Sequence, residues 1–256
     1  MHELVHHLKL TKPKLFIVEP QLLERSLAAA AEAGIDKSNI FAFDVLVANF
    51  NEHVRSWNEL LGYGEKDWVT GVDPAKVVAQ YASTSGTSGL PKAAMLSHNY
   101  HVSQASFLLS SDDLPYKVRR LTALAPFHVF ATPIVPASVR QGHTAYIMRR
   151  LDLKPFIEYI EQFGISETYM PPPVVVSLPQ SPHCTKEALQ SLRQIWFGGA
   201  SLKYSNQLPL YASLHEDAKI QPVWGMTEAG WITAGIWPEK YTDSSVGRPL
   251  PGYHVK

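Results

Sequence analysis

The sequence has little cysteine, no long apolar run and no excess of either charge, and each absence excludes a class of protein. Cys184 is the only cysteine among 256 residues, which excludes an intramolecular disulfide framework and an all-cysteine metal site. Without a run of about 18 apolar residues, no transmembrane helix is expected. The 23 basic and 23 acidic side chains balance, so the sequence shows no excess of positive charge of the kind that binds nucleic acid or an anionic membrane. The opening residues lack a secretory signal, so we expect a cytoplasmic protein, with a peroxisomal location left open.

Hydrophobic residues make up 45% of the chain, which excludes a mostly disordered polymer. Short apolar runs predict strands, and these lie at 15–18, 40–43, 77–81, 121–125, 144–148, 168–170, 195–197 and 220–224. Segments of helical period lie between them, at 21–33, 54–61, from about 97, 152–163 and 202–214. Gly34, Gly62 and Gly164 stand where three of these helices are expected to end. This order predicts an α/β fold with layered, mainly parallel sheets.

One segment combines hydroxyl side chains, glycines and a lysine, and it is Thr84-Ser85-Gly86-Thr87-Ser88-Gly89-Leu90-Pro91-Lys92. We expect it between a strand and a helix. Its glycines let backbone N–H groups turn inward and its hydroxyls add short donors, which suits phosphate oxygens. A flexible Ser/Gly linker fits the composition equally well. It is not a Walker A loop, because no glycine directly precedes Lys92 and no Ser or Thr follows it. An amidase-type serine hydrolase that uses Ser85 or Ser88 with Lys92 is a further interpretation.

The same segment resembles the phosphate-loop signature of the adenylate-forming (AMP-binding) superfamily, which includes acyl- and aryl-CoA ligases. Further segments resemble later motifs of that family in the same order, and they lie at 125–130, 169–172, 197–202, 223–228 and 246–249. Ala93 is a departure, since the family often has glycine there. The resemblance runs from about Lys14 to the last residue. It implies the layered α/β fold of the family's large N-terminal domain.

The resemblance implies ATP-dependent activation of a carboxylic acid to an acyl adenylate, followed by thioester formation with CoA. ATP and Mg²⁺ are the implied cofactors, CoA is the co-substrate, and a small-molecule carboxylic acid is the substrate. The ATP-binding residues that it implies are Thr84, Ser85, Gly86, Thr87, Ser88, Gly89, Lys92, Gly199, Ala200, Ser201, Trp224, Gly225, Met226 and Thr227. Catalytic roles fall to Thr227, Glu228 and Lys92, and Glu228 is also the implied Mg²⁺ ligand.

The resemblance also implies an acyl pocket, lined by His128, Phe130, Tyr169, Gly198 and Gly199. Its bulky side chains favour an aryl or medium-chain acid, and the lack of an acidic residue over 125–131 disfavours an α-amino acid. Plainer interpretations stand beside these roles. Thr227 and Glu228 are also typical of a helix start, Trp224 of a core aromatic and His128 of a packed histidine.

The family's later Thr-Gly-Asp motif and its small C-terminal domain, with a catalytic lysine, find no match. We therefore expect residues 1–256 to be part of the large domain, with the small domain absent, and adenylation by this chain to be slow or undetectable. A catalytically inactive nucleotide- or acyl-binding remnant of the fold is the alternative. Uncovered sheet edges predict an oligomer or poor solubility. His2, His6 and His7 are spaced to meet on one helical turn, but no carboxylates accompany them, and we expect them to be solvated.

Overall fold

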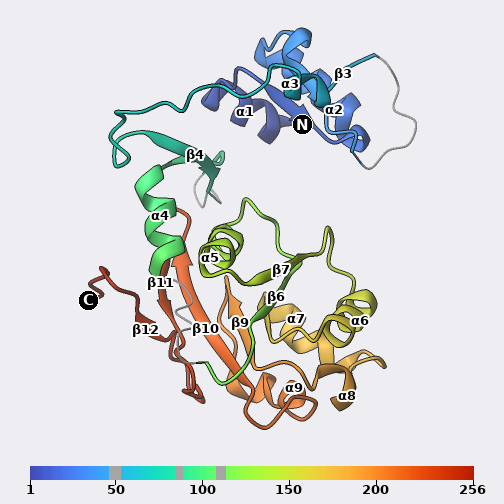
Figure 1. Cartoon of the computed structure of the whole chain (residues 1–256), viewed down its shortest axis with the longest axis vertical. Coiled ribbons are helices and arrows are strands. Elements are labelled where there is room, and N and C mark those ends of the chain that lie inside the picture. Colours follow the sequence, from blue (N-terminus) through green and yellow to red (C-terminus); the bar gives the residue numbers. More distant parts are fainter. Residues whose placement is uncertain (46–52, 85–88, 108–113) are drawn as a thin grey trace. The chain divides into compact units, whose positions relative to one another are not determined.

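The computed structural model describes residues 1–45, 53–84, 89–107 and 114–256, and it divides into two compact units (Figure 1). The first unit spans Met1–Leu96 and the second Ser97–Lys256. Each unit has its own sheet and its own apolar core. No helix within the described ranges has the length and apolar content needed to cross a membrane.

The first unit contains a three-stranded parallel sheet in the order β1-β2-β3, formed by Phe16–Val18, Ile40–Ala42 and Arg55–Ser56. Its helices are α1 (His2–Thr11), α2 (Leu23–Ala33) and α3 (Asn58–Leu61), with 3₁₀ turns η1 (Pro20–Leu22) and η2 (Lys37–Asn39). Val5 and Leu8 of α1 pack on Ala29 of α2. Gly34 ends α2 with a φ of 77°, as the sequence predicts. Two further strands, β4 (Val78–Ser83) and β5 (Ala93–Ser97), pair with each other.

The second unit contains a seven-stranded sheet in the order β12-β11-β10-β9-β8-β6-β7. Five strands run parallel, and they are β6 (Arg119–Thr122), β7 (Thr144–Ile147), β8 (Glu167–Met170), β9 (Gln194–Gly198) and β10 (Lys219–Met226). The mainly parallel sheet is thus confirmed. The sequence did not predict β11 (Gly230–Ala234) and β12 (Arg248–Pro249), which add an antiparallel edge.

Helices cover the sheet of the second unit on both faces. The helices are α4 (His98–Phe107), α5 (Ile134–Gln141), α6 (Leu153–Phe163), α7 (Pro172–Ser177), α8 (Lys186–Leu189) and α9 (Leu208–Tyr211), with 3₁₀ turns η3 (Leu178–Gln180) and η4 (Tyr204–Asn206). Ile195 and Phe197 point into an apolar core with α6 to α9, which lie together beside the sheet in Figure 1. Trp196, between them, points to the opposite face and packs with Ile134 of α5.

The clearest local signals form the predicted elements. The Asp152 side chain accepts a hydrogen bond from the Lys154 N–H at the start of α6, and Gly164 ends that helix with a φ of 57°. Two predicted helices are wrong in extent. Within 54–61, Arg55 instead pairs with Phe41 in the parallel sheet, so only α3 remains helical. Within 202–214, Pro209 lacks an N–H donor, and the segment divides into η4 and α9.

Candidate functional site

The predicted phosphate loop joins two strands, β4 and β5, and the helix expected from about residue 97 follows as α4, so β5 is the element that the sequence did not predict. Ser85, Gly86, Thr87 and Ser88 lie outside the described residues. The ends of the loop are tied together, because the Thr84 N–H donates to the Lys92 carbonyl oxygen at 2.9 Å. Gly89 and Lys92 are exposed, which leaves the Lys92 ammonium accessible to an anion.

Two histidines of α1 contact the two ends of this loop, one at Pro91 within it and one at Ser83 directly before it. His6 Nε2 lies 2.9 Å from the Pro91 carbonyl oxygen, and His7 Nδ1 lies 3.1 Å from the Ser83 hydroxyl oxygen. Both side chains are half-buried, so the expectation that they are solvated was wrong. Sequence spacing gives no signal for such contacts, because their partners lie 76 and 85 residues further along the chain. The described part of the chain holds no group of three residues that could ligate a metal.

Thr227 and Glu228 lie in the turn of a hairpin between β10 and β11, and the helix-start interpretation is therefore wrong. The Ala229 N–H donates to the Met226 carbonyl oxygen at 3.1 Å within this turn. The pairing of β10 with β11 is irregular at Gly225, where an added Cβ would overlap the Gly230 carbonyl. Glu228 is exposed, which leaves its carboxylate accessible to a cation.

Trp224 and Met226 project from the end of β10 with 45% and 50% of their surface exposed. A core aromatic would be buried, so the interpretation of Trp224 as a core residue is wrong. A flat ring half open to solvent offers a face on which a base can stack.

The glycine segment 198–201 lies at the end of β9, beside β10. Gly198 is paired with Val223, and a Cβ on Gly198 would come within 2.9 Å of the Val223 carbonyl oxygen. The backbones of the two strands therefore approach closely only because residue 198 is glycine. Gly199, with a φ of 90°, then turns the chain outward, and it is exposed together with Ala200 and Ser201.

Because β9 and β10 are parallel neighbours, their carboxyl ends open onto one edge of the sheet. Gly199, Ala200, Ser201, Trp224, Gly225, Met226, Thr227 and Glu228 all follow or complete these two strand ends. Ligands of open α/β sheets bind at such carboxyl edges. The structure thus brings together the predicted ATP-binding residues of the second unit.

The predicted acyl-pocket residues divide between surface and core. His128 is exposed, and its Nδ1 accepts a hydrogen bond from the Phe130 N–H at 3.2 Å. Phe130 and Tyr169 are buried in an aromatic cluster with Trp196 and Trp231, which the sequence analysis missed. Burial raises the pKa of the Tyr169 hydroxyl, so this group stays protonated at neutral pH.

A buried ion pair joins the neighbouring strands β6 and β8. Arg120 and Glu167 are directly opposed on β6 and β8, and Arg120 Nε donates to Glu167 Oε2 at 2.9 Å. The Tyr116 hydroxyl shares its one proton between two acceptors, Gln194 Oε1 on β9 at 2.8 Å and Glu167 Oε1 at 3.2 Å. Charged residues beside predicted apolar strands are the only sequence signal for this pair.

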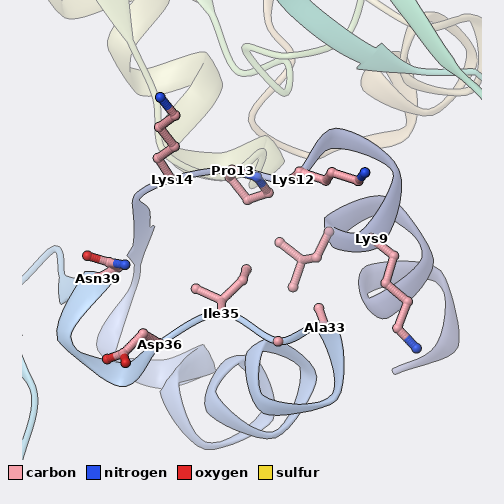
Figure 2. A pocket seen from close by; sticks show the side chains of 10 residues that line it. Lys9, Lys12, Pro13, Lys14, Ala33, Ile35, Asp36 and Asn39 are labelled. Carbon is pink, nitrogen blue, oxygen red and sulfur yellow. The ribbon is translucent and has the colours of Figure 1, made fainter.

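A cavity of about 470 Å³ lies in the first unit between α1 and α2 (Figure 2). Its wall combines apolar residues such as Leu8 and Ile35 with three lysines, Lys9, Lys12 and Lys14. Figure 2 shows the three ammonium groups pointing in different directions, away from the cavity. None of the predicted site residues lines it.

Comparison with known proteins relates this arrangement to a family. The family model described as AMP-binding enzyme matches residues 1–256. Acyl-CoA synthetase ACTT5 of Alternaria alternata is 36% identical over 263 residues, which cover 99% of this chain and 45% of that protein. Phenylacetyl-CoA ligase epaB of Aspergillus niger is 34% identical over 267 residues, which cover 100% of this chain and 49% of that protein.

The crystal structure of ATP-bound MatB from Rhodopseudomonas palustris has a TM-score of 0.78 at 22% identity, covering 98% of this chain and 48% of that chain. The likeness supports the same layered α/β fold. The chain spans about half the length of the curated relatives it matches. Since the family model matches every residue, the chain belongs to the AMP-binding enzyme family.

Proposed function

We propose that the chain supplies part of the ATP site of an acid–thiol ligase. In that reaction a carboxylate oxygen attacks the α-phosphorus of ATP, the bond to pyrophosphate breaks, and the thiol of CoA then displaces AMP from the acyl adenylate. The observation that carries the proposal is the shared carboxyl edge of β9 and β10, where Gly199–Ser201, Trp224–Met226 and Glu228 are exposed and Thr227 is half-buried. Two relatives are named as an acyl-CoA synthetase and a phenylacetyl-CoA ligase, which supports the same chemistry.

At this edge each exposed residue has a role that its chemistry allows. Trp224 offers a face to the adenine, and the backbone at Gly199 lets a flat ring approach closely. Thr227 would donate its hydroxyl to the α-phosphate or to the substrate carboxylate. Glu228 fits Mg²⁺, because its carboxylate is exposed and forms no ion pair with any residue that the structure describes. When bound, Mg²⁺ would neutralise charge that develops on the phosphates.

Lys92 and the loop before it would hold the β- and γ-phosphates. The exposed ammonium of Lys92 and the closure of the loop by Thr84 support this role. For the acid substrate we propose an aryl or medium-chain carboxylic acid, and one relative named as a phenylacetyl-CoA ligase supports this class. A CoA thiol as acceptor and a cytoplasmic location belong to the same proposal.

Exchange of labelled pyrophosphate into ATP, measured with and without phenylacetate, tests the proposed reaction. We expect slow exchange that requires the acid and falls about 100-fold or more in Glu228→Gln, because the variant loses the carboxylate that holds Mg²⁺. Glu216→Gln, which neutralises another exposed carboxylate, is the matched control and should leave exchange unchanged.

Exchange that does not require the acid, or that survives in Glu228→Gln, would contradict the proposed role of this edge. Binding of Mg·ATP without any exchange would instead favour the alternative of a nucleotide-binding remnant.

A further inference from the structure

Side chains from α4 and from the C-terminal segment hold the backbone around the Thr227–Glu228 turn. The Trp231 N–H donates to Gln104 Oε1 at 2.9 Å, and Gln104 Nε2 donates to the Trp231 carbonyl oxygen at 3.4 Å. The same Nε2 donates to the Tyr253 hydroxyl oxygen at 3.1 Å. Tyr253 in turn donates its hydroxyl proton to the Ala229 carbonyl oxygen. The Gln104 amide thus links the first residues of β11 to the C-terminal segment.

Burial and backbone shape show that this arrangement is closely packed. Gln104 is only 6% exposed, so its amide cannot exchange these partners for bulk water. Gly230 has a φ of 80°, and an added Cβ at this position would overlap the Gln104 amide. The approach of α4 to the hairpin therefore depends on glycine at position 230.

Tyr100 lies four residues before Gln104 on α4. It contacts the hairpin turn at Thr227, on the side that leads from β10. Its hydroxyl donates to the Thr227 carbonyl oxygen at 3.4 Å. Burial raises the pKa of Tyr100 to about 12. Tyr100 therefore remains a protonated donor at neutral pH.

Apart from the Gln104–Tyr253 hydrogen bond, these contacts end on backbone atoms of residues 227–231, so they leave the Thr227 hydroxyl and the Glu228 carboxylate available to a ligand. A site that must stabilise developing charge works best when its groups are held in place before the ligand arrives. We infer that Tyr100, Gln104 and Tyr253 are positioning residues that fix the Thr227–Glu228 turn for Mg·ATP. This inference rests on the proposed function.

Two conservative variants test the inference, namely Tyr253→Phe, which removes one hydroxyl, and Gln104→Met, which keeps the length of the side chain but removes its amide. We expect amide hydrogen exchange over residues 227–231 to become about fivefold faster or more, since each variant loses at least one hydrogen bond worth about 1 kcal/mol. Affinity for Mg·ATP should fall by a similar factor, measured by titration calorimetry. Affinity for ATP without Mg²⁺ should change less, because Glu228 is the proposed Mg²⁺ ligand.

Tyr211→Phe is the matched control. Its hydroxyl oxygen accepts a hydrogen bond from the Ile220 N–H at 2.9 Å, near the opposite end of β10. This variant should lose comparable stability while leaving both exchange at 227–231 and Mg·ATP affinity unchanged.

Unchanged exchange at 227–231 in both Tyr253→Phe and Gln104→Met would overturn the inference. An equal loss of Mg·ATP affinity in Tyr211→Phe would also overturn it, because the effect would then be one of general stability. If the unmodified chain binds no Mg·ATP, the proposed function fails. Faster amide exchange at 227–231 in the two variants would still show that these side chains fix the Thr227–Glu228 turn.

Discussion

Replacement of Glu167 by alanine is expected to lower the free energy of unfolding by about 3–5 kcal/mol, because it leaves a buried guanidinium without its carboxylate. Arg120 and Glu167 are each 1% exposed, so water cannot take the place of the lost partner. The same change removes the acceptor that Glu167 offers to the Tyr116 hydroxyl. The loss should appear in urea denaturation as a lower transition midpoint.

Two further variants show whether the loss comes from the unpaired buried charge or would follow from any substitution of a paired glutamate. Glu158→Ala breaks an exposed pair with Lys154, at 3.8 Å, and should cost no more than about 0.5 kcal/mol. Combining Glu167→Leu with Arg120→Met removes both charges and should recover most of the stability. A loss below about 1 kcal/mol in Glu167→Ala would show that the pair is not buried as described.

Replacement of Trp231 by alanine is expected to cost about 3–5 kcal/mol, the range found when a large aromatic side chain is deleted from a core. Trp231 is 1% exposed, and its ring centroid lies 5.5 Å from that of Phe130 and 5.8 Å from that of Trp196. The variant leaves a cavity against Phe130 and Tyr169, two of the predicted acyl-pocket residues. Loss of stability and weaker discrimination between acids should therefore occur together.

Trp231→Phe keeps an aromatic ring in the cluster. Its loss in the free energy of unfolding should therefore be less than half of the loss in Trp231→Ala. Trp68→Ala is the matched control, because the same substitution at a side chain that is 92% exposed should change stability by no more than about 0.5 kcal/mol. Thermal or urea denaturation measures all three variants. Equal losses in Trp231→Ala and Trp68→Ala would contradict the burial of Trp231.

The parts of the fold that the sequence predicts are those governed by local rules. Asp152 and Gly164 bound α6 because a cap and a left-handed residue need only their immediate neighbours. The parallel order of strands then places 199–201 and 224–228 at one edge without any knowledge of side-chain contacts. Their proposed role in binding ATP rests on the resemblance to a family.

The parts that the sequence does not predict depend on distant partners. Arg55 leaves a helical pattern because β2 offers it a strand to pair with. The contacts of Gln104 with Trp231 and of Arg120 with Glu167 join residues 127 and 47 positions apart. No periodicity or spacing along the chain predicts such pairs. The contact between His6 and Pro91 is unpredictable for the same reason.

The central proposal is that Glu228, in the hairpin turn between β10 and β11, holds the Mg²⁺ of Mg·ATP at the carboxyl edge of β9 and β10. Titration calorimetry tests this most directly, with the affinities for Mg·ATP and for ATP without Mg²⁺ measured for the unmodified chain, Glu228→Gln and the control Glu216→Gln. We predict that Glu228→Gln lowers the affinity for Mg·ATP about tenfold or more and the affinity for ATP alone much less, because only Mg²⁺ needs the carboxylate, and that Glu216→Gln changes neither. An unchanged affinity for Mg·ATP in Glu228→Gln, or an equal loss in Glu216→Gln, would contradict the proposed role of this edge.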